Sequence, residues 1–342
     1  MAFKQATVNA SDIPSTQSNF PAYVDLSRLG ITTLAEAQSV RCYADESKVT
    51  ELAREIVSVT EMHVKIPSLT STFVLYVEYD GVSSDYAVTD TYGRNAVWSD
   101  YIAVYHYNDD PGSGSLTDAT GNGHTATAVG SMTSGDLVDG AIGKAWDFDG
   151  SDDRVEISGT SGVAPFWLGD VSVTSLSKLK TTGTNFFPWA IGTLASAYSK
   201  WSLRETLLYR RTSATVGPHI TLTTALNADT NWKHLAYTGK TGDHNTYLNG
   251  ADNGNDTDSR TMLGMTTPNV VVFGGAFPYN GGWGNVSAMY QDELRWRSGQ
   301  LSSDWIETES NNQSDESTFW GTWSDVSASS TPKNPLFFGG GL

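Results

Sequence analysis

Residues 143–157 are GKAWDFDGSDDRVEI, and this stretch decides the fold class of the chain. It contains two short runs of alternating residues with an Asp- and Gly-rich segment between them. In the second run Val155 and Ile157 alternate with Arg154 and Glu156, which is the period of a strand with one buried face. The stretch therefore predicts two strands joined by a solvated, acidic turn.

The same alternation recurs every ~10–20 residues, with turn signals between the runs. Over residues 73–79 the odd positions form an apolar face, and alternate residues of 101–107 line one side of the next strand. Leu294 and Trp296, which alternate with charged residues, predict a half-exposed strand. Helical signals are few, although the serines at 302–303 can cap a short helix. The pattern predicts an all-β protein of sandwiches or jelly rolls.

Composition excludes several classes of protein. The length of 342 residues allows two or three domains. The net charge of −17 would repel phosphate backbones, so we expect no nucleic-acid partner. No stretch approaches the ~18 apolar residues of a membrane-spanning helix, so we expect no membrane insertion. Cys42 is the only cysteine, which excludes an internal disulfide, and residues 1–8 contain no secretory signal.

Four blocks of sequence occur in a fixed order between about Tyr101 and Trp320. They are AVYHY (103–107) with LTDATGNGH (116–124), GKAWDFDGSDDRVEI (143–157), WKHLA (232–236) with YLNG (247–250), and QDELR (291–295) with SDWI (303–306). In this order the blocks resemble the laminin-G-like, concanavalin A-type jelly rolls of bacterial and viral surface proteins. The resemblance implies a jelly roll that is closed by the pairing of its first and last strands.

A second resemblance covers the upstream residues. The motifs FPAYVDL (20–26), VRCY (40–43), LAREI (52–56), HVKIPSL (63–69) and LYVEY (75–79) resemble a small β domain of unknown function that commonly precedes such jelly rolls. The fold class implied is all-β, with a small N-terminal β-sandwich followed by a concanavalin A-like (laminin-G-like) jelly roll. The expected organisation is an N-terminal arm (1–19), the small β domain (20–98), the jelly roll (99–322) and a C-terminal tail (323–342).

A structural calcium ion is one interpretation of the Gly-rich loop that contains Asp118 and Asn122. Calcium takes 6–8 oxygen ligands in flexible geometry, and such a loop can supply several of them. In the family resembled, a distant ligand comes from the closing strand, which here is Asp292. The alternative is that Asp118 and Asn122 only make Asx-turn hydrogen bonds. The acidic group at positions 147–153 could also hold a cation, although a solvated turn is the favoured interpretation there.

Aromatic loops are the candidate ligand sites. Tyr279, Asn280 and Trp283 lie in a Gly-rich segment, and their types suit a glycan, because sugar rings stack on aromatic rings while amides bind hydroxyls. The FFPW run at 186–189 is a second such segment. The alternative is that these rings cover the core or pack against a neighbouring subunit.

Enzyme signatures are absent from the sequence. It contains no Gly-x-Ser-x-Gly elbow and no His-Glu-x-x-His motif. The six histidines are scattered without metal-ligand spacing and are expected to be strand or turn residues. Paired carboxylates such as Asp292 and Glu293 could in principle cleave glycosides, but in the family resembled this pair belongs to a structural strand. We therefore expect a protein that is not an enzyme.

The resemblance, taken with the missing export signal, implies a tailed-phage virion protein. The expected role is a capsid decoration, head-fibre or tail component that displays its jelly roll, either to bind host-surface glycans or as a purely structural decoration without a ligand. Its expected partners are other virion proteins and its own copies, as a homo-oligomer located in the virion. The alternative function is a polysaccharide-degrading enzyme, a glycosidase or lyase on the same fold.

Overall fold

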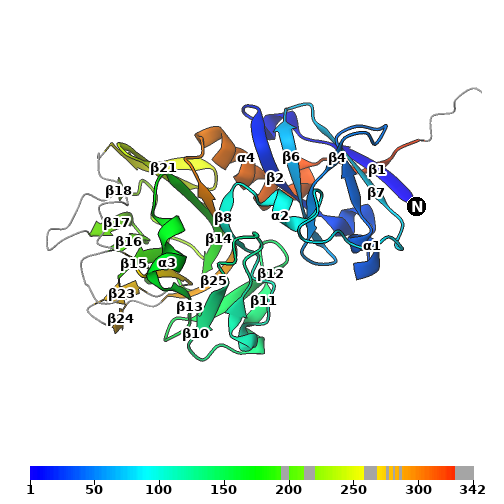
Figure 1. Ribbon diagram of the computed structural model, residues 1–342. Coiled ribbons are helices and arrows are strands. Elements are labelled where there is room, and N and C mark those ends of the chain that lie inside the picture. Colours follow the sequence, from blue (N-terminus) through cyan, green and yellow to red (C-terminus); the bar gives the residue numbers. More distant parts are fainter. Residues whose placement is uncertain are drawn as a thin grey trace, which may run out of the picture.

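The computed structural model describes residues 1–193, 200–211, 220–257, 268–274, 277–279, 282–284 and 287–327. Within them the chain consists mainly of antiparallel strands joined by turns and short helices. Two sheets form an N-terminal part, and two larger sheets form the part that follows (Figure 1). The predicted fold class, a small β-sandwich followed by a concanavalin A-like jelly roll, is confirmed. No helix among the described residues is long and apolar enough to cross a membrane.

The N-terminal part has one five-stranded and one three-stranded sheet. The first has the order β26 (Ser324–Asp325), β1 (Ala2–Thr7), β7 (Val74–Tyr79), β3 (Arg41–Tyr43) and β4 (Glu51–Leu52). The second has the order β2 (Gln17–Asp25), β6 (Glu61–Leu69) and β5 (Arg54–Ile56). Two short helices, α1 (Leu34–Gln38) and α2 (Arg94–Val97), complete this part. The alternation predicted for residues 73–79 is confirmed, because Leu75 and Val77 are fully buried.

The jelly roll has two eight-stranded sheets, named here the β22 sheet and the β25 sheet. The β22 sheet has the order β18 (Ile220–Thr221), β17 (Leu207–Arg211), β16 (Lys200–Leu203), β15 (Trp189–Gly192), β22 (Val270–Phe273), β13 (Arg154–Ser158), β10 (Ala126–Val129) and β9 (Ser115–Leu116). The β25 sheet has the order β11 (Leu137–Asp139), β12 (Lys144–Asp149), β25 (Ala288–Ser298), β14 (Val171–Leu179), β19 (Lys233–Lys240), β20 (Asp243–Leu248) and β21 (Ala251–Asp256). The eighth strand of the β25 sheet, β8 (Tyr101–Tyr105), pairs with β25, so the predicted pairing of the first and last strands is confirmed. The jelly roll also contains the short helix α3 (Thr160–Val163) and the hairpin β23 (Phe277–Tyr279)–β24 (Gly282–Gly284).

The stretch 143–157 forms one strand in each sheet of the jelly roll. Its first run is β12 of the β25 sheet and its second run is β13 of the β22 sheet. Trp146, Phe148 and Val155 are fully buried in the core between the two sheets. The predicted acidic turn therefore connects the two stacked sheets. The apolar residues of the strands on either side of the turn contribute to both faces of the core.

Both ends of the chain differ from the predicted organisation. The segment 1–19, expected to be an arm, contains strand β1, which pairs with β7 along its whole length. Residues 324–325 of the expected tail add a strand at the other side of β1, with Lys4 opposite Asp325. Residues 328–342 lie outside the described residues. The segments 2–7 and 324–325 therefore pair as neighbouring strands of one sheet. This pairing satisfies backbone hydrogen-bonding groups that an unpaired arm would leave to water.

The C-terminal helices belong to the N-terminal part rather than to the jelly roll. α4 (Ser303–Ser314) begins at the predicted cap, where Ser302 Oγ accepts a hydrogen bond from the Trp305 amide at 3.2 Å. It packs against β2 on one side and β19 on the other, so that it joins the two parts (Figure 1). After α5 (Glu316–Phe319), Trp320 is fully buried in the same N-terminal core. The predicted boundary at 322 is therefore displaced, because these aromatic residues complete a core that begins near residue 6.

A β-bulge in β25 changes which side chains face outward. The register against β14 shifts between Thr174 and Leu176, and Glu293 has a φ of 47°. As a result Leu294 and Trp296 point into the jelly-roll core, while both Glu293 and Arg295 lie on the outer face of the sheet. The predicted half-exposed strand is wrong, since Glu293 is 0% and Arg295 1% exposed. The N-terminal part and α4 cover this half of the outer face.

Candidate functional site

The part of the outer face that remains open carries two aromatic rings. Tyr290 on β25 lies opposite Asp147 of β12 and opposite Lys178 of β14. Because Trp146 and Phe148 point into the core, Asp147 points outward, and so does its partner Tyr290. Trp232, just before β19, lies beside it with ring centroids 6.4 Å apart and planes inclined by 45°. Both rings are half-buried, so each offers an exposed surface.

Charged side chains surround this aromatic pair. The Lys178 ammonium lies 5.9 Å from the centroid of Trp232 and 5.7 Å from that of Tyr290. The Lys180 ammonium lies 5.2 Å from the Tyr290 centroid and pairs with Asp147. At these distances each ammonium is attracted by the ring quadrupole, which holds the side chain near the ring. The result is a platform of two rings with two cations and a carboxylate beside it, named here the Trp232–Tyr290 platform.

This arrangement suits a sugar chemically. The C–H face of a pyranose stacks on a half-exposed aromatic ring, and a second ring at an angle can contact the neighbouring sugar or edge. Asp147 can accept hydrogen bonds from hydroxyl groups, and the lysines can donate them. Two ammonium groups beside the rings also favour a sugar that carries a carboxylate.

The predicted glycan residues lie elsewhere, on the β23–β24 hairpin. Tyr279 is the last residue of β23 and pairs with Gly282, and Trp283 pairs with Pro278. Asn280 lies outside the described residues. The glycan interpretation of this hairpin stays a prediction. For the second aromatic segment the core interpretation is confirmed, since Phe186, Phe187 and Trp189 are at most 2% exposed.

The predicted calcium ligands Asp118 and Asn122 make hydrogen bonds within the protein. The Asp118 carboxylate accepts hydrogen bonds from the amides of Val104, Thr120 and His124 at 2.9–3.2 Å, and Asn122 Nδ2 donates to the Tyr101 carbonyl at 2.9 Å. The bond from the Thr120 amide, two residues along the chain, is the Asx-turn contact of the alternative interpretation. The bonds to Val104 and Tyr101 hold the loop against β8, and Asp118 uses carboxylate oxygens that calcium would need.

Asp292 is separated from this loop by strand geometry. Val104 lies opposite Arg295 on β25, three residues along from Asp292, which at ~3.3 Å per residue is about 10 Å. One Asp292 oxygen accepts a hydrogen bond from the Ile142 amide at 2.8 Å, and the other has no hydrogen-bond partner among the described residues. The calcium site formed by Asp118, Asn122 and Asp292 stays a prediction.

A small polar cleft lies where the N-terminal part meets the jelly roll. It has a volume of about 180 Å³, and Glu55, Arg94, His106, Asn108 and Asp109 are among the residues that line it. Ligand pockets usually measure ~300–1,000 Å³. The cleft is therefore large enough for water and ions but small for an oligosaccharide, which disfavours it as the active site of a polysaccharide-degrading enzyme.

Comparison with known proteins finds similarity at the level of structure only. No protein family matches the chain, and no curated protein matches it. The binding domain of botulinum neurotoxin serotype D/C matches with a TM-score of 0.47 and 13% identity, over 63% of this chain and 52% of that chain. Domain 4 of AbnA, a GH43 extracellular arabinanase from Geobacillus stearothermophilus solved with arabinotriose, matches with 0.43 and 19%, over 61% and 98%. NanB sialidase from Streptococcus pneumoniae matches with 0.40 and 11%, over 50% and 28%.

The matched region thus corresponds to about half the length of the neurotoxin chain and to nearly all of the arabinanase domain. At these TM-scores the similarity carries no conclusion about what this chain binds.

Proposed function

We propose that the protein is a non-enzymatic glycan-binding protein whose jelly roll contacts sugar through the Trp232–Tyr290 platform. The observation that carries the proposal is a pair of half-buried rings on an open sheet face, 6.4 Å apart and flanked by Lys178 and Lys180. Exposed aromatic rings are unfavourably solvated, and the apolar face of a sugar can cover them. The hydroxyl groups of the sugar would then form hydrogen bonds with Asp147 and with water. Because Lys178 and Lys180 carry positive charge, the proposal includes glycans with acidic groups.

The test is binding of the full chain to a glycan array, followed by affinity measurement on the best ligand. Trp232→Ala is expected to weaken binding at least tenfold. A flat ligand ring that stacks on one aromatic side chain, as a nucleobase does, contributes ~1–3 kcal/mol. The matched control is Tyr92→Ala. Tyr92 pairs with Tyr86 in the N-terminal part, with centroids 5.8 Å apart and planes at 47°, so the control removes a half-buried ring of similar geometry.

Three outcomes would contradict the proposal. Unchanged affinity of Trp232→Ala would remove the platform from the site. Loss of affinity in Trp283→Ala alone would assign binding to the hairpin that the sequence predicted. New reducing ends or unsaturated products released from the bound glycan would favour the alternative, a glycosidase or lyase.

The finer proposal is a role in a phage virion, and the resemblance of the sequence blocks supports it. It holds that the N-terminal part contacts other virion proteins or copies of this chain, and that the jelly roll projects toward host-surface glycans. Imaging of purified particles with and without the protein tests the location, and light scattering of the purified chain tests the homo-oligomer. Absence from the particle, or a monomer at all concentrations, would contradict it.

A further inference from the structure

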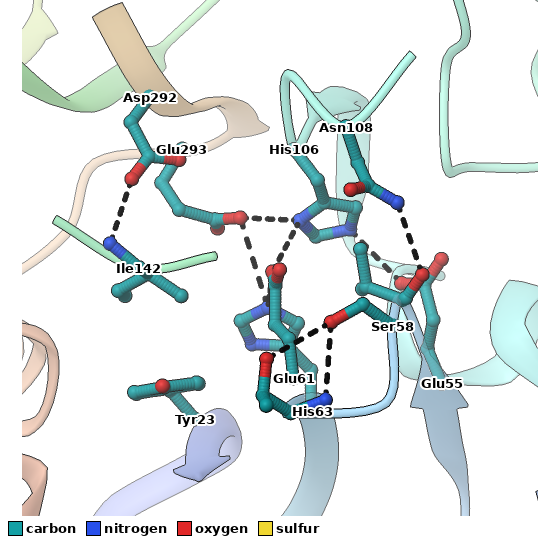
Figure 2. A network of polar contacts seen from close by, with 12 residues as sticks. Tyr23, Glu55, Ser58, Glu61, His63, His106, Asn108, Ile142, Asp292 and Glu293 are labelled. Atoms are coloured by element: carbon teal, nitrogen blue, oxygen red, sulfur yellow. Dashed lines mark hydrogen bonds and ion pairs between the residues drawn. The ribbon is translucent and has the colours of Figure 1, made fainter. Parts of the chain in front are cut away.

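Two histidines and two glutamates meet in the interior between the N-terminal part and the jelly roll (Figure 2). Glu61 and His63 come from β6, His106 directly follows β8, and Glu293 lies on the bulge of β25. Their side chains point toward one another, and one ligand atom of each lies within 4.8 Å of the other three. All four side chains are at most 7% exposed. The sequence does not reveal this group, because His63 and His106 are far apart in the chain.

The separations resemble those of a four-coordinate metal site. Tetrahedral bonds of 2.0–2.1 Å place neighbouring ligand atoms about 3.3 Å apart. His63 Nε2 lies 3.2 Å from Glu61 Oε1 and 3.7 Å from Glu293 Oε1. His106 Nδ1 lies 3.7 Å from the same Glu61 oxygen and 2.5 Å from the Glu293 oxygen. The four atoms therefore surround a position that a small cation could fill once the His106 Nδ1–Glu293 Oε1 pair, now at 2.5 Å, opens by about 0.8 Å.

The surrounding groups orient these four side chains. His106 Nε2 lies 3.0 Å from Glu55 Oε2, which leaves Nδ1 to face the group. Arg295 donates to Glu293 Oε2 at 2.7 and 3.0 Å, so only Oε1 of Glu293 faces the histidines. Carboxylates that hold the far nitrogen of a histidine are a common support of metal ligands, since they fix the tautomer and the ring orientation.

One carboxylate of the group, that of Glu61, has an oxygen without a hydrogen-bond partner among the described residues. This oxygen is Oε2, and Glu61 is 1% exposed. Arg295 is shared between Glu293 and Glu309, at 2.7 and 2.9 Å, and so does not neutralise Glu61. The unpartnered oxygen of this buried carboxylate is a position that a bound cation would satisfy.

An ion-pair network without metal is the competing explanation. In it His63 would donate from Nε2 to Glu61 and accept from Arg295 at Nδ1. The Arg295 Nη2–His63 Nδ1 distance is 3.4 Å, which is longer than the usual 2.7–3.2 Å. A metal bound at Nε2 places the His63 proton on Nδ1, and Arg295 Nη2, which can only donate, then has to turn away from that nitrogen. The polar cleft, lined by His106 and Glu55, supplies a path from solvent.

We infer that Glu61, His63, His106 and Glu293 form a binding site for a first-row divalent cation, with Zn²⁺ the best match to two imidazole nitrogens and two carboxylate oxygens. The cation would be structural, because the ligands leave no open coordination position. It would link β6 of the N-terminal part to β8 and β25 of the jelly roll, and so fix the two parts relative to each other.

The experiment uses the full chain, stripped of metal with a chelator and then loaded with ZnCl₂ or CoCl₂. After gel filtration, elemental analysis should find about one zinc per chain. Bound Co²⁺ should show the intense visible bands of a tetrahedral site with nitrogen ligands, which exposed carboxylates alone do not produce. Added zinc should also raise the melting temperature.

The variants test which residues hold the ion. Glu61→Gln keeps the shape of the side chain and removes the ligand charge, and we expect at least a tenfold loss of zinc affinity. The matched control changes Asp149 and Asp152 to Asn. With Asp153 they form the other group of ligand-type atoms within 4.8 Å that the described residues contain, and both are exposed.

The inference fails if the wild-type chain retains no zinc and shows no tetrahedral cobalt bands. It also fails if zinc affinity is lost in the Asp149 and Asp152 control but kept in Glu61→Gln. Should Glu61→Gln not fold, the cobalt spectrum of the wild-type chain decides alone. Glycan binding is measured separately, so the failure of either proposal leaves the other intact.

Discussion

Replacing Trp320 by alanine tests whether the C-terminal segment is part of the N-terminal core. Trp320 is fully buried, and its Nε1 donates to the Tyr23 carbonyl at 2.8 Å. Truncation of a buried Trp costs 3–5 kcal/mol. The Tyr23 carbonyl keeps a second hydrogen bond, from Asn312 Nδ2 at 3.0 Å, so the lost bond adds little. We expect the free energy of unfolding of the N-terminal part to fall by about 4 kcal/mol.

The assay is urea denaturation of the full chain, followed by circular dichroism and by limited proteolysis within residues 1–98. The control is Trp323→Ala, because Trp323 is half-buried at the edge of the same core and should cost about 1 kcal/mol. A loss below about 1.5 kcal/mol for Trp320→Ala, or equal losses for the two variants, would refute the reasoning. Residues 303–325 would then be a separable appendage of the jelly roll.

Three further predictions concern pH, ligand charge and calcium. Burial raises the pKa of Glu316 from 4.5 to about 7, despite its ion pair with Arg28. The folded chain therefore binds this proton more tightly, and stability present below pH 4.5 is lost as the pH rises to 7, by about 3 kcal/mol. Glu316→Gln should flatten this slope in denaturation curves, and an unchanged slope would contradict it. Lys178→Gln should weaken binding of carboxylate-bearing glycans more than of neutral ones on the array; equal loss would exclude a charge contact. Asp118→Ala should lower the melting temperature equally in calcium and in chelator, and a calcium-dependent difference would support the predicted ion.

Much of the fold could be predicted from local pattern. The alternation at 73–79 and 101–107 and the cap at Ser302 follow from which side chains are apolar and from the spacing of a strand or a helix. These features depend on neighbours in the chain, so a single sequence reveals them. The aromatic run at 186–189 allows two interpretations, because the alternation of residues does not show which atoms pack against a ring.

The candidate sites could not be predicted in the same way. The Trp232–Tyr290 platform joins Tyr290 on β25 to Trp232 just before β19, and β14 separates these two strands in the sheet. The His63–His106 contact, with ring centroids 4.9 Å apart, joins the N-terminal part to the jelly roll. Both depend on strand order and on the packing of one part on the other, which no local spacing encodes.

The sequence by itself determined that the chain forms antiparallel sheets and where most strands lie, since burial of alternating side chains is a local requirement. The tertiary structure alone decided which outer face is covered. One extra residue in the bulge of β25 turned Glu293 and Arg295 to the side where β6 and α4 dock, and burial there forced opposite charges to meet. Charges separated widely in the chain interact only after folding brings them within a few ångströms, in an interior whose low dielectric makes their pairing obligatory.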